Sequence, residues 1–140
     1  MKGQTGLKDY PLRRTMPDEI TTPSGVSLQD ISFEMLEKGE IKGEDIRISS
    51  ETLLMQADIA RQSGNDHLAD NFSRAAEMVR IDNDRILEIY NALRPYRSTE
   101  DELLQIADEL RSDYNADRTA AFVEEAAKVL KLRKKLRGDR

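Results

Sequence analysis

The sequence contains no cysteine, no tryptophan and a single histidine in 140 residues. Without cysteine, disulfides, thiolate metal sites and a cysteine nucleophile are excluded. No segment approaches the roughly 20 apolar residues of a membrane helix, and the first residues do not resemble a secretory signal. Acidic residues outnumber basic ones, 27 to 22, which does not favour nucleic acid or anionic membranes as partners. We therefore expect a cytoplasmic protein that binds neither.

The composition is also poor in apolar residues. Hydrophobic residues make up 38% of the chain and charged residues 35%, whereas globular domains are usually closer to half apolar. A chain of this size forms one modest domain. We expect it to gain apolar burial by docking on a partner as well as from its own core.

Proline and glycine concentrate at the N-terminus. Residues 1–27 hold three of the four prolines and three of the seven glycines. This pattern predicts an extended irregular arm over residues 1–31, followed by a helical domain over residues 32–140.

From Ser32 onward the periodicity is helical, and no segment alternates with period two. The class is therefore all-α, a small domain of about five main helices. Caps and breakers predict a short helix at 33–38 and longer helices at 50–62, from Asp66, from Asp82 to Arg94, from Glu100 to Tyr114, and at 117–136. The expected inner face of the helix from Asp66 is Leu68, Phe72, Ala75 and Val79, and that of the helix from Asp82 is Ile86, Ile89, Tyr90 and Leu93. The helix from Glu100 is expected to bury Leu103, Ile106, Ala107, Leu110 and Tyr114, and the last helix Phe122, Val123, Ala126, Val129 and Leu130.

No residue pattern indicates chemistry by this chain alone. There is no phosphate-binding glycine loop, nucleophile elbow or metal-ligand cluster. His67 lies beside two aspartates, but a plain surface histidine is the simpler interpretation. The acids of 100–113 fit a solvated helix face, and the basic residues of 128–140 fit a helix C-terminus, where the macrodipole favours cations. We predict no catalytic, cofactor-binding or metal-binding residue.

The corner Arg94-Pro95-Tyr96-Arg97 is more distinctive. Tyrosine and arginine are enriched in interface hot spots, and the proline fixes the end of a helix. Packing of Tyr96 within the domain, with the arginines on local acids, explains the corner equally well. Arg133 falls beside the stripe of the last helix, where it either snorkels or meets a carboxylate of a partner.

Residues 84–99 resemble one family closely, the small subunit of adenosylcobalamin-dependent diol and glycerol dehydratases. Collinear blocks extend the resemblance over nearly the whole chain. They are residues 9–12, 45–49, 51–53, 71–77, 102–107, 121–127 and 133–139. Only eight residues precede Asp9, whereas many diol dehydratase small subunits carry a long N-terminal extension, so in this feature the chain is similar to glycerol dehydratase.

The resemblance implies a non-catalytic structural subunit of a hydro-lyase. Such an enzyme converts 1,2-propanediol or glycerol to an aldehyde with loss of water by a radical mechanism. Adenosylcobalamin would be held by the large and medium subunits, in a dimer of three-subunit units. The location would be the cytoplasm or a bacterial microcompartment. The substrate preference stays open.

Eight residues are the predicted contacts to the partner subunits: Tyr10, Pro11, Arg47, Tyr90, Arg94, Tyr96, Arg97 and Arg133. Two other functions are weighed against this one. A free-standing helical adaptor would dock through the Arg94–Arg97 corner and have no enzyme activity. Nucleic-acid binding through residues 128–140 is disfavoured by the acidic total and by the lack of interleaved aromatics.

Overall fold

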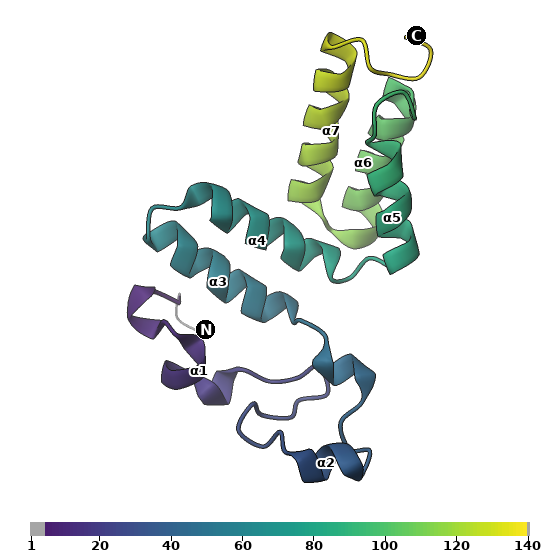
Figure 1. Ribbon diagram of the computed structural model, residues 1–140. Coiled ribbons are helices and arrows are strands. Elements are labelled where there is room, and N and C mark those ends of the chain that lie inside the picture. Colours follow the sequence, from purple (N-terminus) through teal and green to yellow (C-terminus); the bar gives the residue numbers. More distant parts are fainter. Residues whose placement is uncertain (1–4, 140) are drawn as a thin grey trace. The chain divides into compact units, whose positions relative to one another are not determined.

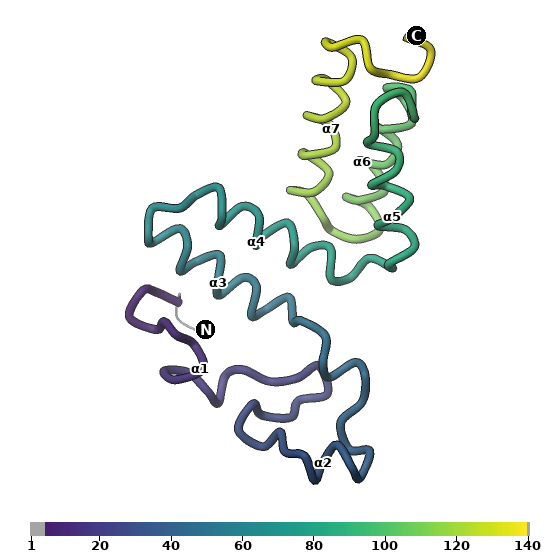
Figure 2. The backbone as a smooth tube through the Cα atoms, viewed as in Figure 1, coloured from purple at the N-terminus to yellow at the C-terminus, as the bar shows by residue number. Residues whose placement is uncertain are grey.

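The computed structural model describes residues 5–139, which fall into two compact units, one up to Ala76 and one from Glu77 onward. Figures 1 and 2 show that the described chain is built from helices, turns and loops. Its β-structure is one isolated bridge between Thr21 and Ser27. The predicted all-α class is confirmed. Within the described residues, no helix is long and apolar enough to cross a membrane.

The first unit begins with short elements. They are the 3-10 turn η1 (Leu7–Asp9), α1 (Leu12–Thr15), η2 (Pro17–Glu19), α2 (Phe33–Glu37) and η3 (Gly43–Ile46). The described part of the predicted arm therefore consists of single turns joined by loops, and the Tyr10–Pro11 peptide bond is cis. The side chain of Gln62 binds the beginning of the described arm. Its Nε2 donates to the Thr5 carbonyl at 2.8 Å, and its Oε1 accepts from the Leu7 N–H at 3.1 Å.

The rest of the first unit is a helical hairpin, α3 (Ser50–Gln62) and α4 (Asp66–Met78), of which α4 runs into the start of the second unit. Ser49 caps α3 as predicted, its Oγ accepting from the Thr52 N–H at 3.1 Å. At the far end of the hairpin, Ser50 Oγ donates to the Ala76 carbonyl at 2.9 Å. Gly64 ends the turn region with a φ of 81°, a left-handed conformation that glycine adopts without strain.

The inner face of α4 differs from the predicted one. The buried residues are Ala69, Ser73 and Ala76, whereas Leu68 and Val79 are exposed. The prediction assumed that the bulkiest apolar stripe faces inward. Small side chains instead occupy the buried face, and Phe72 of the predicted stripe is half-buried.

The second unit contains α5 (Asn83–Ala92), α6 (Glu100–Tyr114) and α7 (Asp117–Leu132), with α6 and α7 packed along each other (Figure 1). The turn between them is made by Asn115, at a φ of 52° as its role in turning the chain requires. The largest fully buried side chains are Leu103, Leu110 and Val123. The predicted inner face of α6 is confirmed, with Ile106 and Tyr114 half-buried at its edge.

Three predictions for the second unit are wrong. Tyr90 is 65% exposed instead of buried in the stripe of α5. Phe122 and Val129 are exposed, because α7 turns Thr119, Ala120, Val123 and Ala127 toward the core. The last helix ends at Leu132, four residues before Leu136, because Lys134 takes up a left-handed φ of 51°.

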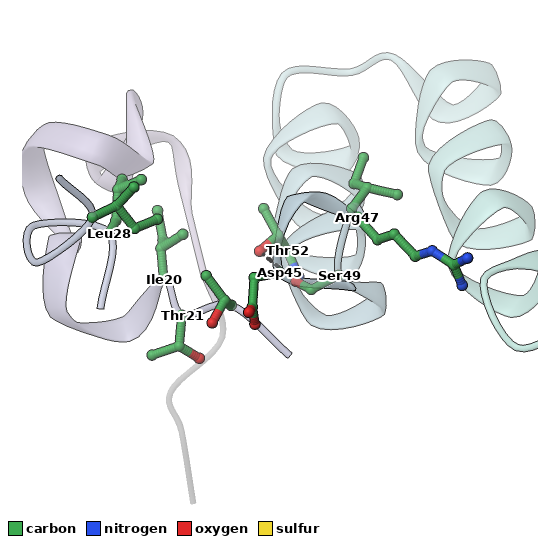
Figure 3. A pocket seen from close by; sticks show the side chains of 10 residues that line it. Ile20, Thr21, Leu28, Asp45, Arg47, Ser49 and Thr52 are labelled. Carbon is green, nitrogen blue, oxygen red and sulfur yellow. Dashed lines mark hydrogen bonds between the residues drawn. The ribbon is translucent and has the colours of Figure 1, made fainter. Parts of the chain in front are cut away.

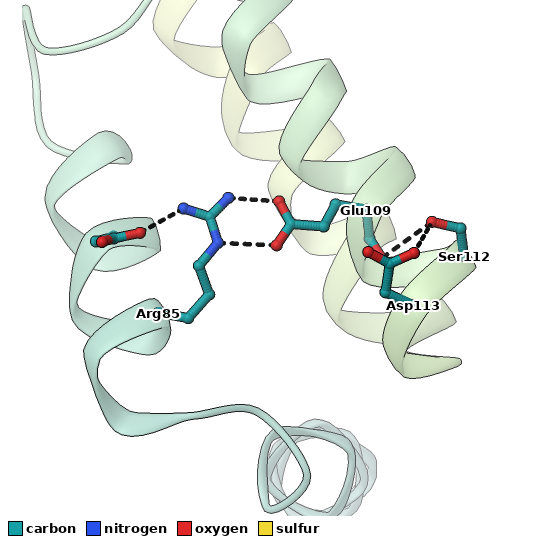
Figure 4. A network of polar contacts seen from close by, with 5 residues as sticks. Arg85, Glu109, Ser112 and Asp113 are labelled. Carbon is teal, nitrogen blue, oxygen red and sulfur yellow. Dashed lines mark hydrogen bonds and ion pairs between the residues drawn. The ribbon is translucent and has the colours of Figure 1, made fainter.

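Ion pairs and one distant cap hold the three helices together. Figure 4 shows Arg85 of α5 facing Glu109 of α6, where its Nε donates at 2.8 Å. Arg111 of α6 pairs with Glu124 of α7 at 2.6 Å. The N-terminus of α7 has no cap from its own N-cap residue. Instead, the carboxylate of Glu77 accepts from the N–H groups of Arg118 and Thr119, at 3.1 and 2.8 Å.

Candidate functional site

The corner between α5 and α6 is joined to the segment that follows α7. Tyr96 N–H donates to the Lys135 carbonyl at 2.6 Å, and Lys135 Nζ donates to Tyr96 Oη at 2.7 Å. Further along, Arg137 N–H donates to the Ser98 carbonyl at 2.9 Å. We call residues 94–98 and 133–137 the paired segments. They bring together two parts of the sequence about 40 residues apart.

Side chains reinforce the paired segments. Arg137 forms an ion pair with Glu102 at 2.6 Å, and Ser98 Oγ donates to the Ala92 carbonyl at 2.9 Å. Thr99 and Glu102 make the capping box that starts α6. Because the Glu102 carboxylate accepts from the Thr99 N–H and from Arg137, its pKa lies below the usual range. The start of α6 and the tail are therefore one connected structure.

The predicted contact residues lie in three places. Arg94, Tyr96, Arg97 and Arg133 lie on the paired segments, and Tyr90 lies on the outer face of α5. Tyr10 and Pro11 precede α1, and Arg47 follows η3. Tyr96 is half-buried and bonded to Lys135, whereas the other seven are exposed. The structure thus supports an intramolecular role for Tyr96. The contacts of all eight residues with a partner stay a prediction.

A hollow of about 190 Å³ lies in the first unit, between the loop around Ile20 and Leu28 and the start of α3 (Figure 3). Four aliphatic and six polar or charged residues line it, and Asp45 is its buried acid. Hydrogen bonds from Ser24, and from the Lys42 N–H at 2.8 Å, hold the pKa of Asp45 at about 2. Hydrogen bonds within the chain therefore stabilise the ionised Asp45 carboxylate, and no ligand is needed to account for its charge.

The three glutamates of α6 each form an ion pair. Glu100 pairs with Lys131 at 2.6 Å, Glu102 with Arg137, and Glu109 with Arg85. His67 is exposed in the first turn of α4. Among residues 5–139 no group of three or more histidines and acids is placed to hold a metal ion. The arrangement offers ion pairs and caps, and we assign no acid–base chemistry to it.

Exposed apolar side chains are frequent in both units. In the first unit Phe33, Ile46 and Ile48 are exposed, and in the second Leu87, Tyr90 and Leu132 are. Contiguous exposed apolar surface marks interaction sites in proteins. Sequence periodicity placed Tyr90 in a buried stripe and gave no signal for Leu132 or Lys135. The early end of α7 and the pairing of the tail with the corner are tertiary features.

The fold and its surface define a helical chain that is suited to docking on other proteins. Residues 5–137 match the family model described as dehydratase small subunit, and the chain belongs to this family. It is 51% identical over 133 residues to the propanediol dehydratase small subunit of Citrobacter freundii. It is 50% identical to the protein of the same name from Salmonella typhimurium. Each match covers 95% of this chain and 77% of the relative.

Proposed function

We propose that this chain is the non-catalytic structural small subunit of a diol dehydratase that removes water from 1,2-propanediol to give an aldehyde. The observation that carries the proposal is the identity of about half over 133 residues to two propanediol dehydratase small subunits. The absence of organised catalytic groups in the sequence is consistent with a structural role. Exposed apolar side chains in both units provide surface for large and medium partner subunits.

The proposal includes adenosylcobalamin, held by the large and medium subunits. The hollow in the first unit, about 190 Å³, is smaller than the roughly 300–1,000 Å³ of sites for drug-sized ligands, and a corrin is larger still. The hollow therefore does not fit the cofactor, and we derive no step of the reaction through this chain. A dimer of three-subunit units, and location in the cytoplasm or a microcompartment, belong to the same proposal and rest on the family resemblance.

Co-expression of the tagged chain with the large and medium subunits encoded beside it tests the proposal. We expect one complex that forms propionaldehyde from 1,2-propanediol when adenosylcobalamin is added. A parallel assay with glycerol compares the rates of aldehyde formation from the two substrates. Native mass spectrometry gives the stoichiometry. Full turnover by large and medium subunits alone would contradict an essential role for this chain. A monodisperse protein without partners would favour the adaptor function.

A further inference from the structure

The cations of the second unit fall into paired and unpaired ones. Arg85, Arg111, Lys131 and Arg137 each form an ion pair with a glutamate. By contrast, six exposed cations of this unit make no ion pair within residues 5–139: Arg80, Arg94, Arg97, Lys128, Arg133 and Lys134. Four of them lie on the paired segments, namely Arg94, Arg97, Arg133 and Lys134. We call these four the cationic corner. The pairing of the two segments gathers these four positive charges in a chain whose net charge is −5.

The backbone beneath the cationic corner is held in an uncommon geometry. Tyr96 and Lys134 have φ values of 64° and 51°, in the left-handed region that is unfavourable for a residue with a side chain. Such conformations persist where surrounding contacts determine them. Here the hydrogen bonds between Tyr96 and Lys135 supply those contacts. The four cations are thus presented from a fixed backbone, which lowers the cost of ordering it on binding.

An apolar row continues the surface along α5. Leu87 and Tyr90 are three residues apart, which places them on one face of α5, and Arg94 lies just beyond the end of this helix at Ala92. Leu87 and Tyr90 are both more than half exposed. A tyrosine beside arginines is the composition of an interface hot spot.

We propose that the cationic corner, with Leu87 and Tyr90, docks on an acidic patch of the dehydratase large subunit. The inference rests on the proposed function and adds the surface and the chemistry of its partner. Charge complementarity selects an acidic partner, and the adjoining apolar row favours a protein over a nucleic acid. The negative charge of the whole chain also opposes a polyanion, whereas a local acidic patch on a protein meets only the corner.

The test compares two variants of the full chain in the three-subunit system. The first replaces Arg94, Arg97, Arg133 and Lys134 with alanine. The control replaces four exposed cations of the first unit, Lys8, Arg13, Arg14 and Lys42. Each variant removes four positive charges, so the net charge changes from −5 to −9 in both. Affinity for the large and medium subunits is measured by surface plasmon resonance over a series of salt concentrations, and circular dichroism checks the fold.

We expect the corner variant to lose about tenfold or more in affinity at low ionic strength, mainly through slower association, and to lose most of the salt dependence. The control should bind like the unchanged chain. Equal losses in both variants would overturn the proposal, since only bulk charge would then matter. Binding of the corner variant at full affinity would overturn it as well and leave the proposed function intact. Failure of the unchanged chain to assemble would refute both. Salt-sensitive retention of a DNA or RNA duplex, abolished in the corner variant, would identify a nucleic-acid site instead.

Discussion

Leu103 and Leu104 offer a matched test of the packing in the second unit, because they are adjacent on α6 and differ in burial. Leu103 is 0% exposed and Leu104 is 39% exposed. Replacing a buried leucine with alanine costs about 2–5 kcal/mol, from the lost transfer free energy and the cavity left behind. Leu103 contacts a core of close-packed helices that has little freedom to collapse, so we expect about 3 kcal/mol. For Leu104→Ala we expect about 1 kcal/mol or less.

The free energy of unfolding is measured by urea titration followed by far-ultraviolet circular dichroism. Equal denaturant slopes in the two variants would show that only stability has changed. Since the chain has two compact units, hydrogen exchange of α6 and α7 peptides checks that the loss falls in the second unit. If the two substitutions cost the same within about 0.5 kcal/mol, the assigned orientation of α6 is wrong.

Three further predictions follow from contacts described above. Glu77→Ala removes the distant cap of α7 and should lower the free energy of unfolding by about 0.5–2 kcal/mol, measured by urea titration, with Glu77→Gln losing less because its amide oxygen still accepts. Asp45 has a pKa of about 2 in the folded chain and 3.8 as its ordinary value, so its charge stabilises the fold above pH 3.8, and this contribution is lost as the pH falls through 2. The stability difference between the unchanged chain and Asp45→Asn should therefore shrink over that interval, and a difference that grew there would refute the assignment. Tyr96→Phe removes the acceptor of Lys135 and should cost about 0.5–1.5 kcal/mol, seen as faster hydrogen exchange in residues 94–98 without loss of the helices.

Helix boundaries could be predicted where the signal lies within a few residues. The start of α3 could be predicted from Ser49, because its hydroxyl accepts a hydrogen bond from the Thr52 N–H, three residues later. The capping box of Thr99 and the turn at Asn115 are local in the same way. By contrast, the cap of α7 comes from Glu77, about 40 residues earlier in the chain. No pattern of neighbouring residues encodes that contact.

The candidate site was predictable in part for the same reason. The composition of the Arg94–Arg97 corner fitted an interface and local packing equally well, and Arg94 and Arg97 are exposed. The sequence left Tyr96 undecided between an interface and the domain, and its bonds to Lys135 place it against the tail of its own chain. Lys135 and Arg137 looked like part of a solvated basic end. Their role in holding the corner depends on the chain folding back, which periodicity does not reveal.

The errors about helix faces have a common cause. In α4 and α7 the predicted inner stripes favoured larger apolar side chains, of which Val123 is buried, but the buried faces carry mostly alanine, serine and threonine. Full burial of a leucine, phenylalanine or valine is worth about 1.5–3 kcal/mol, so Leu68, Val79, Phe122 and Val129 leave favourable free energy unused in the isolated chain. A partner that covers these side chains gains this free energy on binding. Because the partner binds the folded chain, the apparent stability of the chain then rises with the concentration of the partner. Under the proposed function, the unfolding temperature of this chain should therefore rise as large subunit is added. An unchanged temperature at the highest concentration of large subunit would mean that it does not bind the folded chain, which would contradict the proposed function.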